Sequence, residues 1–126
     1  MRTPPSPPTV LLVEDHIAVR TLQRFLLQRV GMTVVECDDL ADGERLLREF
    51  TPDMVVLDVN LPSGHGLSLL PLIDRTSTRV LVMSGMNQAH LARLSLRGAD
   101  AFMPKPFEPS AFLTQIQELL PWPAAQ

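Results

Sequence analysis

Short apolar runs alternate along the chain with longer segments in which apolar residues recur every three or four positions. The short runs are typical of strands buried on both faces of a sheet. They are residues 9–13, 33–37, 54–58, 79–84 and 101–103. The segments of helical period are residues 14–31, 39–50, 66–75, 87–98 and 109–120. This alternation predicts an α/β fold of the (βα)5 type, a doubly wound five-stranded parallel sheet between helices in three α/β/α layers.

Individual residues indicate where these helices begin and end. Asp38 or Asp39 can cap the second helix, and Pro109 opens the last one. Gly31 is placed to end the first helix, and Pro71 is expected to shorten or kink the third.

Two helices show a clear apolar stripe that is expected to pack on the sheet. In the first helix the stripe is Ala18, Leu22, Phe25, Leu26 and Val30. The polar side opposite this stripe is predicted to be Arg20, Gln23, Arg24 and Gln28. In the last helix the core-facing residues are Phe112, Ile116 and Leu119.

The composition of the chain narrows its class. The 126 residues fit one domain, expected at residues 9–120 between a disordered proline-rich tail at 1–8 and a C-terminal tail at 121–126. A formal net charge of −3 argues against direct nucleic-acid binding through a basic surface. No apolar stretch approaches the roughly 20 residues of a membrane helix, so no membrane contact is expected. Cys37, the only cysteine, cannot form an internal disulfide, which favours a cytoplasmic protein.

Polar side chains gather at the positions where the predicted strands end. The carboxyl ends of parallel strands meet at one edge of an open sheet, and chemistry collects there. The residues expected at this edge are Glu14, Asp15, Asp58, Ser84 and Lys105. Asp58 is notable among them because it ends a wholly apolar run, and a buried carboxylate is costly unless a partner compensates its charge.

A metal ion is the simplest compensation for these acids. Three adjacent carboxylates repel one another, whereas a divalent cation and the Lys105 ammonium together balance their charge. Oxygen ligands favour Mg²⁺, with Mn²⁺ as a second candidate, over zinc or copper. The three histidines are scattered over different segments and offer no competing cluster.

Four segments at this edge carry a family resemblance. They are LLVEDH with the acidic pair, VVLDVNLPSGHG with Asp58, VLVMSG with Ser84, and AFMPKPF with Lys105. Together and in this order they resemble the receiver domain of bacterial two-component response regulators, over roughly residues 9–120. The resemblance implies a flavodoxin-like sheet of strand order 2-1-3-4-5. It also implies a phosphorylated signalling switch of a two-component system or phosphorelay, not a turnover enzyme.

The resemblance further implies a role for each residue of the site. Asp58 would be the nucleophile that accepts a phosphoryl group from a sensor histidine kinase or a histidine phosphotransfer domain. Glu14, Asp15 and Asp58 would hold Mg²⁺ together with the backbone carbonyl of Asn60. The groups expected to bind phosphoryl oxygens are on Asn60, Ser84, Gly85 and Lys105.

The same resemblance implies a switch and a special peptide bond. Ser84 and Phe102 would move together after phosphorylation, although Phe102 is equally typical of an ordinary core aromatic. The bond between Lys105 and Pro106 is a candidate for the cis form. Two residues depart from the family pattern. Pro104 precedes the site lysine and could shorten the last strand, and His65 is expected to be a solvated loop residue.

Partner surfaces follow from the family as well. Helix 87–98, strand 101–103 and helix 109–120 would form the face that binds a downstream protein target or a second copy of the chain. An output domain outside this sequence is the other expected recipient of the signal. The first helix, beside the acidic pair, is where kinases of the family dock.

Three alternative functions are distinguishable from the sequence. A phosphohydrolase of the haloacid dehalogenase kind would need a second Asp where Asn60 stands, as well as an inserted cap. An FMN-binding flavodoxin would need a first loop rich in hydroxyl groups and glycine, but VEDHIAV is acidic. A receiver-like module that binds proteins without phosphorylation is the remaining alternative.

Overall fold

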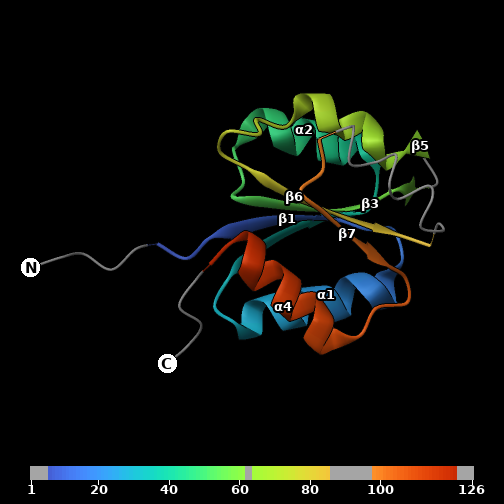
Figure 1. Cartoon of the computed structure of the whole chain (residues 1–126). Coiled ribbons are helices and arrows are strands. Elements are labelled where there is room, and N and C mark those ends of the chain that lie inside the picture. Colours follow the sequence, from blue (N-terminus) through green and yellow to red (C-terminus); the bar gives the residue numbers. More distant parts are fainter. Residues whose placement is uncertain (1–5, 62–63, 86–97, 122–126) are drawn as a thin grey trace, which may run out of the picture.

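The computed structural model describes residues 6–61, 64–85 and 98–121. Its main feature is a five-stranded parallel sheet of order β2-β1-β3-β6-β7, which confirms the predicted 2-1-3-4-5 arrangement of the five main strands (Figure 1). These strands are β1 (Thr9–Val13), β2 (Thr33–Cys37), β3 (Met54–Asp58), β6 (Arg79–Ser84) and β7 (Ala101–Pro104).

Helices cover both faces of the sheet and complete the predicted three layers (Figure 1). One face carries α1 (Ile17–Arg29) and α4 (Pro109–Leu119), and the other carries α2 (Leu40–Glu49) and the 3-10 helix η1 (Gly66–Leu72). The predicted helix at 87–98 lies almost wholly outside the described residues. Beyond β3, the two short strands β4 (Asn60–Leu61) and β5 (Gly64–His65) pair in antiparallel fashion.

The sheet separates two apolar cores because side chains alternate between its faces. Leu11, Val55 and Leu57 pack on the side of α2 and η1. Val10 and Leu12 pack with Phe112 and other residues on the side of α1 and α4. Every residue of β3 is buried, as its continuous apolar run predicts, and this includes Asp58.

The register brings the carboxyl ends of the strands together. Val13 of β1 is aligned with Cys37 of β2 and Leu57 of β3. Further along the sheet, Ser84 of β6 is aligned with Pro104 of β7. The next residues, Glu14 and Lys105, therefore extend from the same edge as Asp58.

The buried face of α1 differs from the sequence prediction. Phe25 is 56% exposed and Leu22 is 39% exposed, whereas Gln23 is fully buried beside Leu26 and Leu27. The helix is apolar on two flanks, so periodicity does not decide which flank meets the sheet. Successive residues turn by about 100°, and packing through Leu26 and Leu27 brings Gln23 inward and turns Leu22 outward. The prediction was right for Leu26 and wrong for Ala18, Leu22, Phe25 and Gln23.

The other helices follow their predicted signals more closely. Asp39 caps α2, because its Oδ1 accepts a hydrogen bond of 2.8 Å from the backbone N–H of Asp42. Pro109 opens α4, whose Phe112 and Ile116 are fully buried. The helix expected at 66–75 is shorter and is a 3-10 helix that contains Pro71. The missing N–H of proline accounts for this shorter element.

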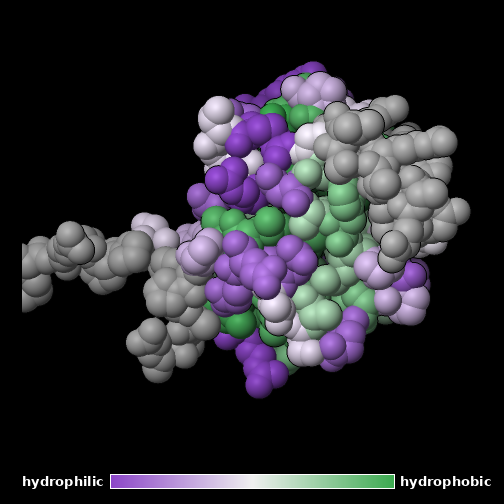
Figure 2. All heavy atoms as spheres, in the orientation of Figure 1, coloured by the Kyte–Doolittle hydropathy of each residue, from purple (hydrophilic) through white to green (hydrophobic). Residues whose placement is uncertain are grey.

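Strand β7 is the edge of the sheet and includes Pro104, so that proline does not shorten it. An edge strand tolerates proline because one side of its backbone has no neighbouring strand. Figure 2 shows hydrophobic residues gathered over this edge, between the two helical layers. Within the described residues, no helix has the length and apolar character needed to cross a bilayer.

Candidate functional site

Three carboxylates meet at the carboxyl end of the sheet. Glu14, Asp15 and Asp58 each offer an oxygen, and these oxygens lie within 4.8 Å of one another. Glu14 and Asp58 are almost fully buried, at 1% and 4% exposure, and Asp15 is half-buried. Such a group of acids is unfavourable without positive charge nearby. Its oxygens are the type and number of protein ligands that suit Mg²⁺.

Lys105 supplies one positive charge directly to this group. Its Nζ lies 2.7 Å from Oε1 of Glu14 and 3.4 Å from Oδ2 of Asp58. Burial by itself lowers the pKa of Lys105, but the hydrogen bond with Glu14 and the charge of Asp58 outweigh it, so the pKa lies above its usual value. The ammonium is therefore the fixed cation of the site at neutral pH.

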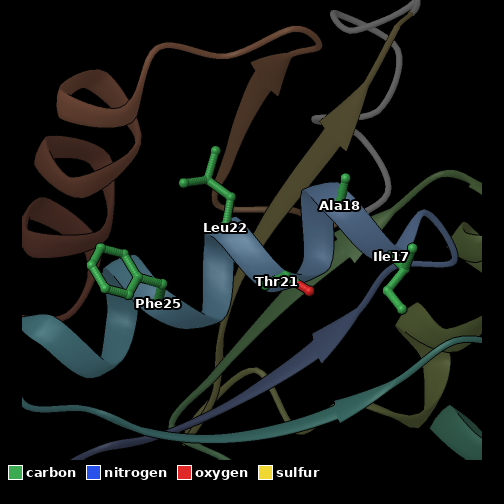
Figure 3. A pocket seen from close by; sticks show the side chains of 5 residues that line it. All are labelled: Ile17, Ala18, Thr21, Leu22 and Phe25. Carbon is green, nitrogen blue, oxygen red and sulfur yellow. The ribbon is translucent and has the colours of Figure 1, made fainter.

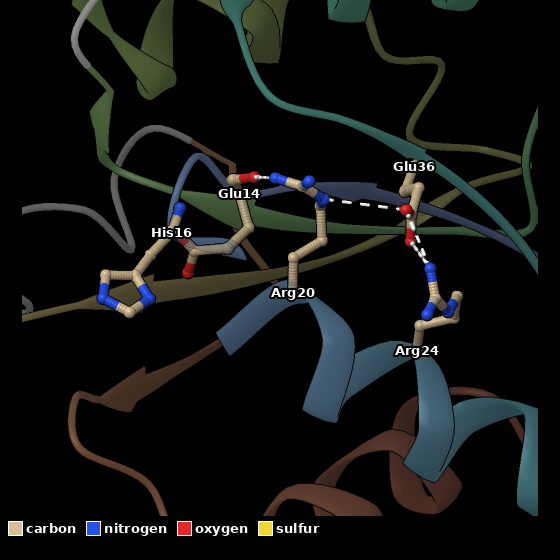
Figure 4. A network of polar contacts seen from close by, with 5 residues as sticks. All are labelled: Glu14, His16, Arg20, Arg24 and Glu36. Atoms are coloured by element: carbon tan, nitrogen blue, oxygen red, sulfur yellow. Dashed lines mark hydrogen bonds and ion pairs between the residues drawn. The ribbon is translucent and has the colours of Figure 1, made fainter. Parts of the chain in front are cut away.

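Both the side chain and the backbone of Glu14 form hydrogen bonds. Its Oε2 accepts a hydrogen bond of 3.1 Å from the backbone N–H of His16, at the start of α1. Its own backbone N–H donates to the carbonyl of Cys37, and its carbonyl accepts a hydrogen bond of 2.9 Å from Nη1 of Arg20. Figure 4 shows that Arg20 also faces Glu36, which pairs with Arg24 as well. This network could not be predicted from the sequence, because it depends on how α1 lies beside β2.

Ser84 and Gly85 follow one another at the end of β6. Ser84 is fully buried, and its carbonyl accepts a hydrogen bond from the backbone N–H of Lys105, which ties the two strand ends together. Gly85 is exposed, and apart from Gly85 itself and its chain neighbours, no heavy atom of the described residues lies within 4 Å of the place where a Cβ would stand. The described residues therefore leave the backbone of Gly85 uncovered.

The structure also describes three further predicted features of the site: Phe102, the bond before Pro106 and the backbone of Asn60. Phe102 is partly buried and packs against the core on the α2 side of the sheet. The Lys105–Pro106 bond is cis, as the resemblance implied. The backbone of Asn60, two residues after Asp58, pairs with His65, and the structure does not describe the side chains of these two residues.

Gly66 is a residue of the site that the sequence analysis missed. A Cβ at this position would overlap the carbonyl oxygen of Asp58, and the Gly66 N–H donates a hydrogen bond of 2.7 Å to the carbonyl of Val59. Only glycine allows the returning loop to pass this close to the phosphoacceptor candidate. The SGHG run contained the glycine, but the contact with Asp58 is visible only in three dimensions.

A second acidic group does not resemble a functional site. Asp38, Asp39 and Asp42 also lie close together, but Asp39 caps α2 and Asp42 pairs with Arg45 at 3.6 Å. Cys37 lies beside them, and burial raises the pKa of its thiol to about 12. These residues are explained by the local structure of α2.

An exposed apolar surface lies on α1, close to the acidic pair. It is formed by Ile17, Ala18, Thr21, Leu22 and Phe25, which line a shallow hollow along the helix (Figure 3). Ile17 is 68% exposed, the highest value among the large apolar residues described. We call this set the α1 apolar surface.

Comparison with known proteins identifies the class of this domain. Residues 10–117 match the response regulator receiver domain family. The match covers most of the chain. It includes all five strands of the main sheet, apart from Thr9, the first residue of β1. The chain therefore belongs to the response regulator receiver domain family.

Particular relatives agree with this assignment. Protein PetR of Rhodobacter capsulatus is 36% identical over 117 residues, which cover 91% of this chain and 49% of that protein. The phosphate regulon transcriptional regulatory protein PhoB of Klebsiella pneumoniae is 32% identical over 117 residues, with 88% and 51% covered. The chain thus spans about half the length of these curated relatives. Among solved structures, a two-component response regulator of the LuxR family from Aurantimonas sp. SI85-9A1 gives a TM-score of 0.80 at 31% identity, with 96% and 90% covered.

Proposed function

We propose that Asp58 accepts a phosphoryl group in a Mg²⁺-dependent reaction and that its phosphorylation switches a protein-binding face of the domain. The observation that carries this proposal is the position of the buried Asp58 carboxylate, within reach of Glu14, Asp15 and Lys105. Receiver domains are signalling regulators rather than turnover enzymes, and this assignment agrees with the family of the chain.

The residues around Asp58 suit a metal-assisted phosphoryl transfer. Glu14, Asp15 and Asp58, with the carbonyl of Asn60, would hold Mg²⁺ or Mn²⁺, which neutralises negative charge on the phosphoryl oxygens. Lys105 would exchange its contact with Asp58 for a phosphoryl oxygen. The hydroxyl of Ser84 and the backbone N–H of Gly85 would donate to the other oxygens.

The proposed reaction is a displacement at phosphorus. An Asp58 carboxylate oxygen attacks the phosphorus of a phosphohistidine on a partner kinase or phosphotransfer domain. The new P–O bond forms as the P–N bond breaks, and the electron pair stays with the imidazole, which takes up a proton. The product is an acyl phosphate on Asp58 and an unmodified histidine on the partner.

The phosphoryl group would act on the structure through charge and hydrogen bonding. It brings close to two negative charges, and the site gains new acceptor oxygens. Ser84 would move toward them and draw the loop after β6 with it. Phe102 lies on the neighbouring strand, two register positions before the partner of Ser84, and would follow into the vacated space.

Two surfaces are proposed for partners. The α1 apolar surface lies beside Glu14 and Asp15, so a helical phosphodonor bound there would present its histidine to Asp58. The edge formed by β7 and α4 would bind a downstream target or a second copy of the chain, and the hydrophobic residues over this edge support that role (Figure 2). Phosphodonors of this kind act in the cytoplasm, which is where we place the domain.

The experiment that tests the proposal is the intact mass of the protein after incubation with acetyl phosphate and Mg²⁺. One phosphoryl adduct is expected, and it should be lost with EDTA and in Asp58→Asn. Asp53→Asn is the matched control, because Asp53 is an exposed acid near the start of β3 and should leave the adduct unchanged. No adduct, together with no change in the amide NMR spectrum on adding beryllofluoride, would contradict the proposal and favour a binding module that works without phosphorylation.

A further inference from the structure

Arg20 links the acidic pair to the neighbouring strand. It lies in the first turn of α1 with its side chain only 15% exposed, and its guanidinium reaches in two directions (Figure 4). Nη1 donates a hydrogen bond of 2.9 Å to the carbonyl oxygen of Glu14. Nε lies 3.7 Å from Oε1 of Glu36 on β2.

The hydrogen bond from Arg20 completes a clamp on the backbone of Glu14. The N–H of Glu14 donates to the carbonyl of Cys37 at 3.1 Å, so both backbone polar groups of this residue are engaged. The carbonyl that Arg20 binds belongs to the peptide unit between Glu14 and Asp15. The orientation of this peptide sets the directions in which the two carboxylates leave the backbone.

Glu36 keeps the Arg20 side chain in place. Its carboxylate also accepts hydrogen bonds of 3.0 and 3.2 Å from Nη1 of Arg24, one helical turn further along α1. Arg20 and Arg24 therefore share one anchor on β2, but of these two arginines only Arg20 also donates a hydrogen bond to Glu14 (Figure 4). Glu36 also offsets the guanidinium charge, which would otherwise lie unbalanced near a cation site.

We propose that Arg20 is a positioning residue for the metal site, which it shapes by fixing the peptide between Glu14 and Asp15. The inference rests on the proposed function, because it takes these carboxylates as Mg²⁺ ligands. Arg20 makes no direct contact with the three ligand carboxylates in this assignment. It acts through the Glu14 carbonyl, as hydrogen bonds behind metal ligands commonly do.

The sign of the effect separates positioning from simple electrostatics. A cation close to the site disfavours a bound divalent ion, so loss of the Arg20 charge by itself would strengthen Mg²⁺ binding. Loss of the clamp leaves the Glu14–Asp15 peptide free to rotate and would weaken binding. The two explanations therefore predict opposite changes in the Mg²⁺ dissociation constant.

The test compares Arg20→Met with Arg24→Met by calorimetric Mg²⁺ titration of the unphosphorylated protein. Both variants remove one arginine from Glu36 and one positive charge from α1, but only Arg20→Met removes the hydrogen bond to Glu14. We expect Arg20→Met to raise the dissociation constant about tenfold and Arg24→Met to leave it within about twofold of wild type. The thermal midpoints of the two metal-free variants should fall by similar amounts.

Each possible result of the Mg²⁺ titration either supports or overturns the positioning role of Arg20. Unchanged or tighter Mg²⁺ binding in Arg20→Met, with normal binding by wild type, would overturn the inference and leave the proposed function intact. Absence of Mg²⁺ binding by wild type would overturn the metal role in the proposed function, and this inference with it. If Arg20→Met does not fold, Arg20→Gln serves instead, since its shorter neutral side chain removes the same positive charge and the guanidinium that binds the Glu14 carbonyl. Weaker Mg²⁺ binding would then support the inference, and unchanged binding would overturn it.

Discussion

Gln23 carries an amide group into the buried face of α1. It is fully buried, and neither its Oε1 nor its Nε2 has a hydrogen-bond partner within the described part of the chain. A buried amide without partners costs about 1–3 kcal/mol of stability. An apolar residue of the same shape at this position would make the folded protein more stable.

Replacement of Gln23 by methionine should therefore stabilise the protein. Methionine has similar length and removes both unpaired polar atoms, so we expect the free energy of unfolding to rise by about 1 kcal/mol. Urea unfolding followed by circular dichroism measures this change. Gln28→Met is the control, because Gln28 is exposed on the same helix and should change stability little. A Gln23→Met protein less stable than wild type would show that the amide has a partner, such as a buried water.

Lys105 gives the folded protein a particular dependence on pH. Its pKa is raised in the folded state, so the folded state holds this proton more tightly than the unfolded chain does. The resulting stability is fully present below the unfolded pKa of about 10.4 and is lost as pH rises through the folded pKa. Lys105 is the only lysine and the chain has no tyrosine, so few other groups titrate in this range.

We predict how the difference in the free energy of unfolding between wild type and Lys105→Met depends on pH in metal-free buffer. Wild type should be the more stable protein, by a constant amount from pH 7 to about pH 9, because the variant leaves Glu14 and Asp58 without their cation. The difference should shrink at higher pH. Comparison with the variant removes the contribution of Cys37, which also titrates in this range. A difference that grows with pH in urea-unfolding measurements would contradict the assignment.

At the scale of elements, α1 combines a structural face with an exposed apolar one. Leu26 and Leu27 pack into the core, whereas the α1 apolar surface is open beside the acidic pair. Isolated exposed apolar residues are common, but a continuous exposed apolar group is typical of a protein-binding surface. This arrangement explains why the helix is apolar on two flanks.

Phe25→Ser tests this division of α1. Phe25 is more than half exposed, so the substitution should change stability by less than about 1 kcal/mol, while transfer from a phosphorylated histidine phosphotransfer domain should slow at least about tenfold. Phosphorylation by acetyl phosphate should stay normal, because that small donor needs no docking surface. Phe112→Ala is the contrasting variant, since Phe112 is fully buried and its loss should cost about 3–5 kcal/mol. Equal rates of transfer in wild type and Phe25→Ser would rule out the docking role.

At the scale of the whole molecule, the sequence predicted the sheet and the edge where the site lies. Continuous apolar runs such as 54–58 identify buried parallel strands, and parallel strands place their carboxyl ends together. The positions of the strand ends were therefore enough to predict that Glu14, Asp58 and Lys105 lie close together, without information on any contact. The family resemblance added the cis bond before Pro106, which composition and periodicity do not reveal.

Other features depended on tertiary packing and could not be predicted in this way. The orientation of α1 was wrong for Gln23 and Phe25, because both flanks of the helix are apolar and only contact with the sheet decides between them. The link from Arg20 to Glu36 joins residues of two elements, and the close passage of Gly66 over Asp58 joins a loop to a strand end. These contacts depend on distances that a pattern along the chain does not contain.

The central claim is that Asp58, and no other carboxylate, carries the phosphoryl group. The most direct test treats the acetyl-phosphate-modified protein with sodium borohydride, which reduces an aspartyl phosphate to homoserine, and then maps the change by peptide mass spectrometry. The account predicts homoserine at position 58 alone. Homoserine at Asp15, at Asp53 or at another acid, with Asp58 unmodified, would contradict it.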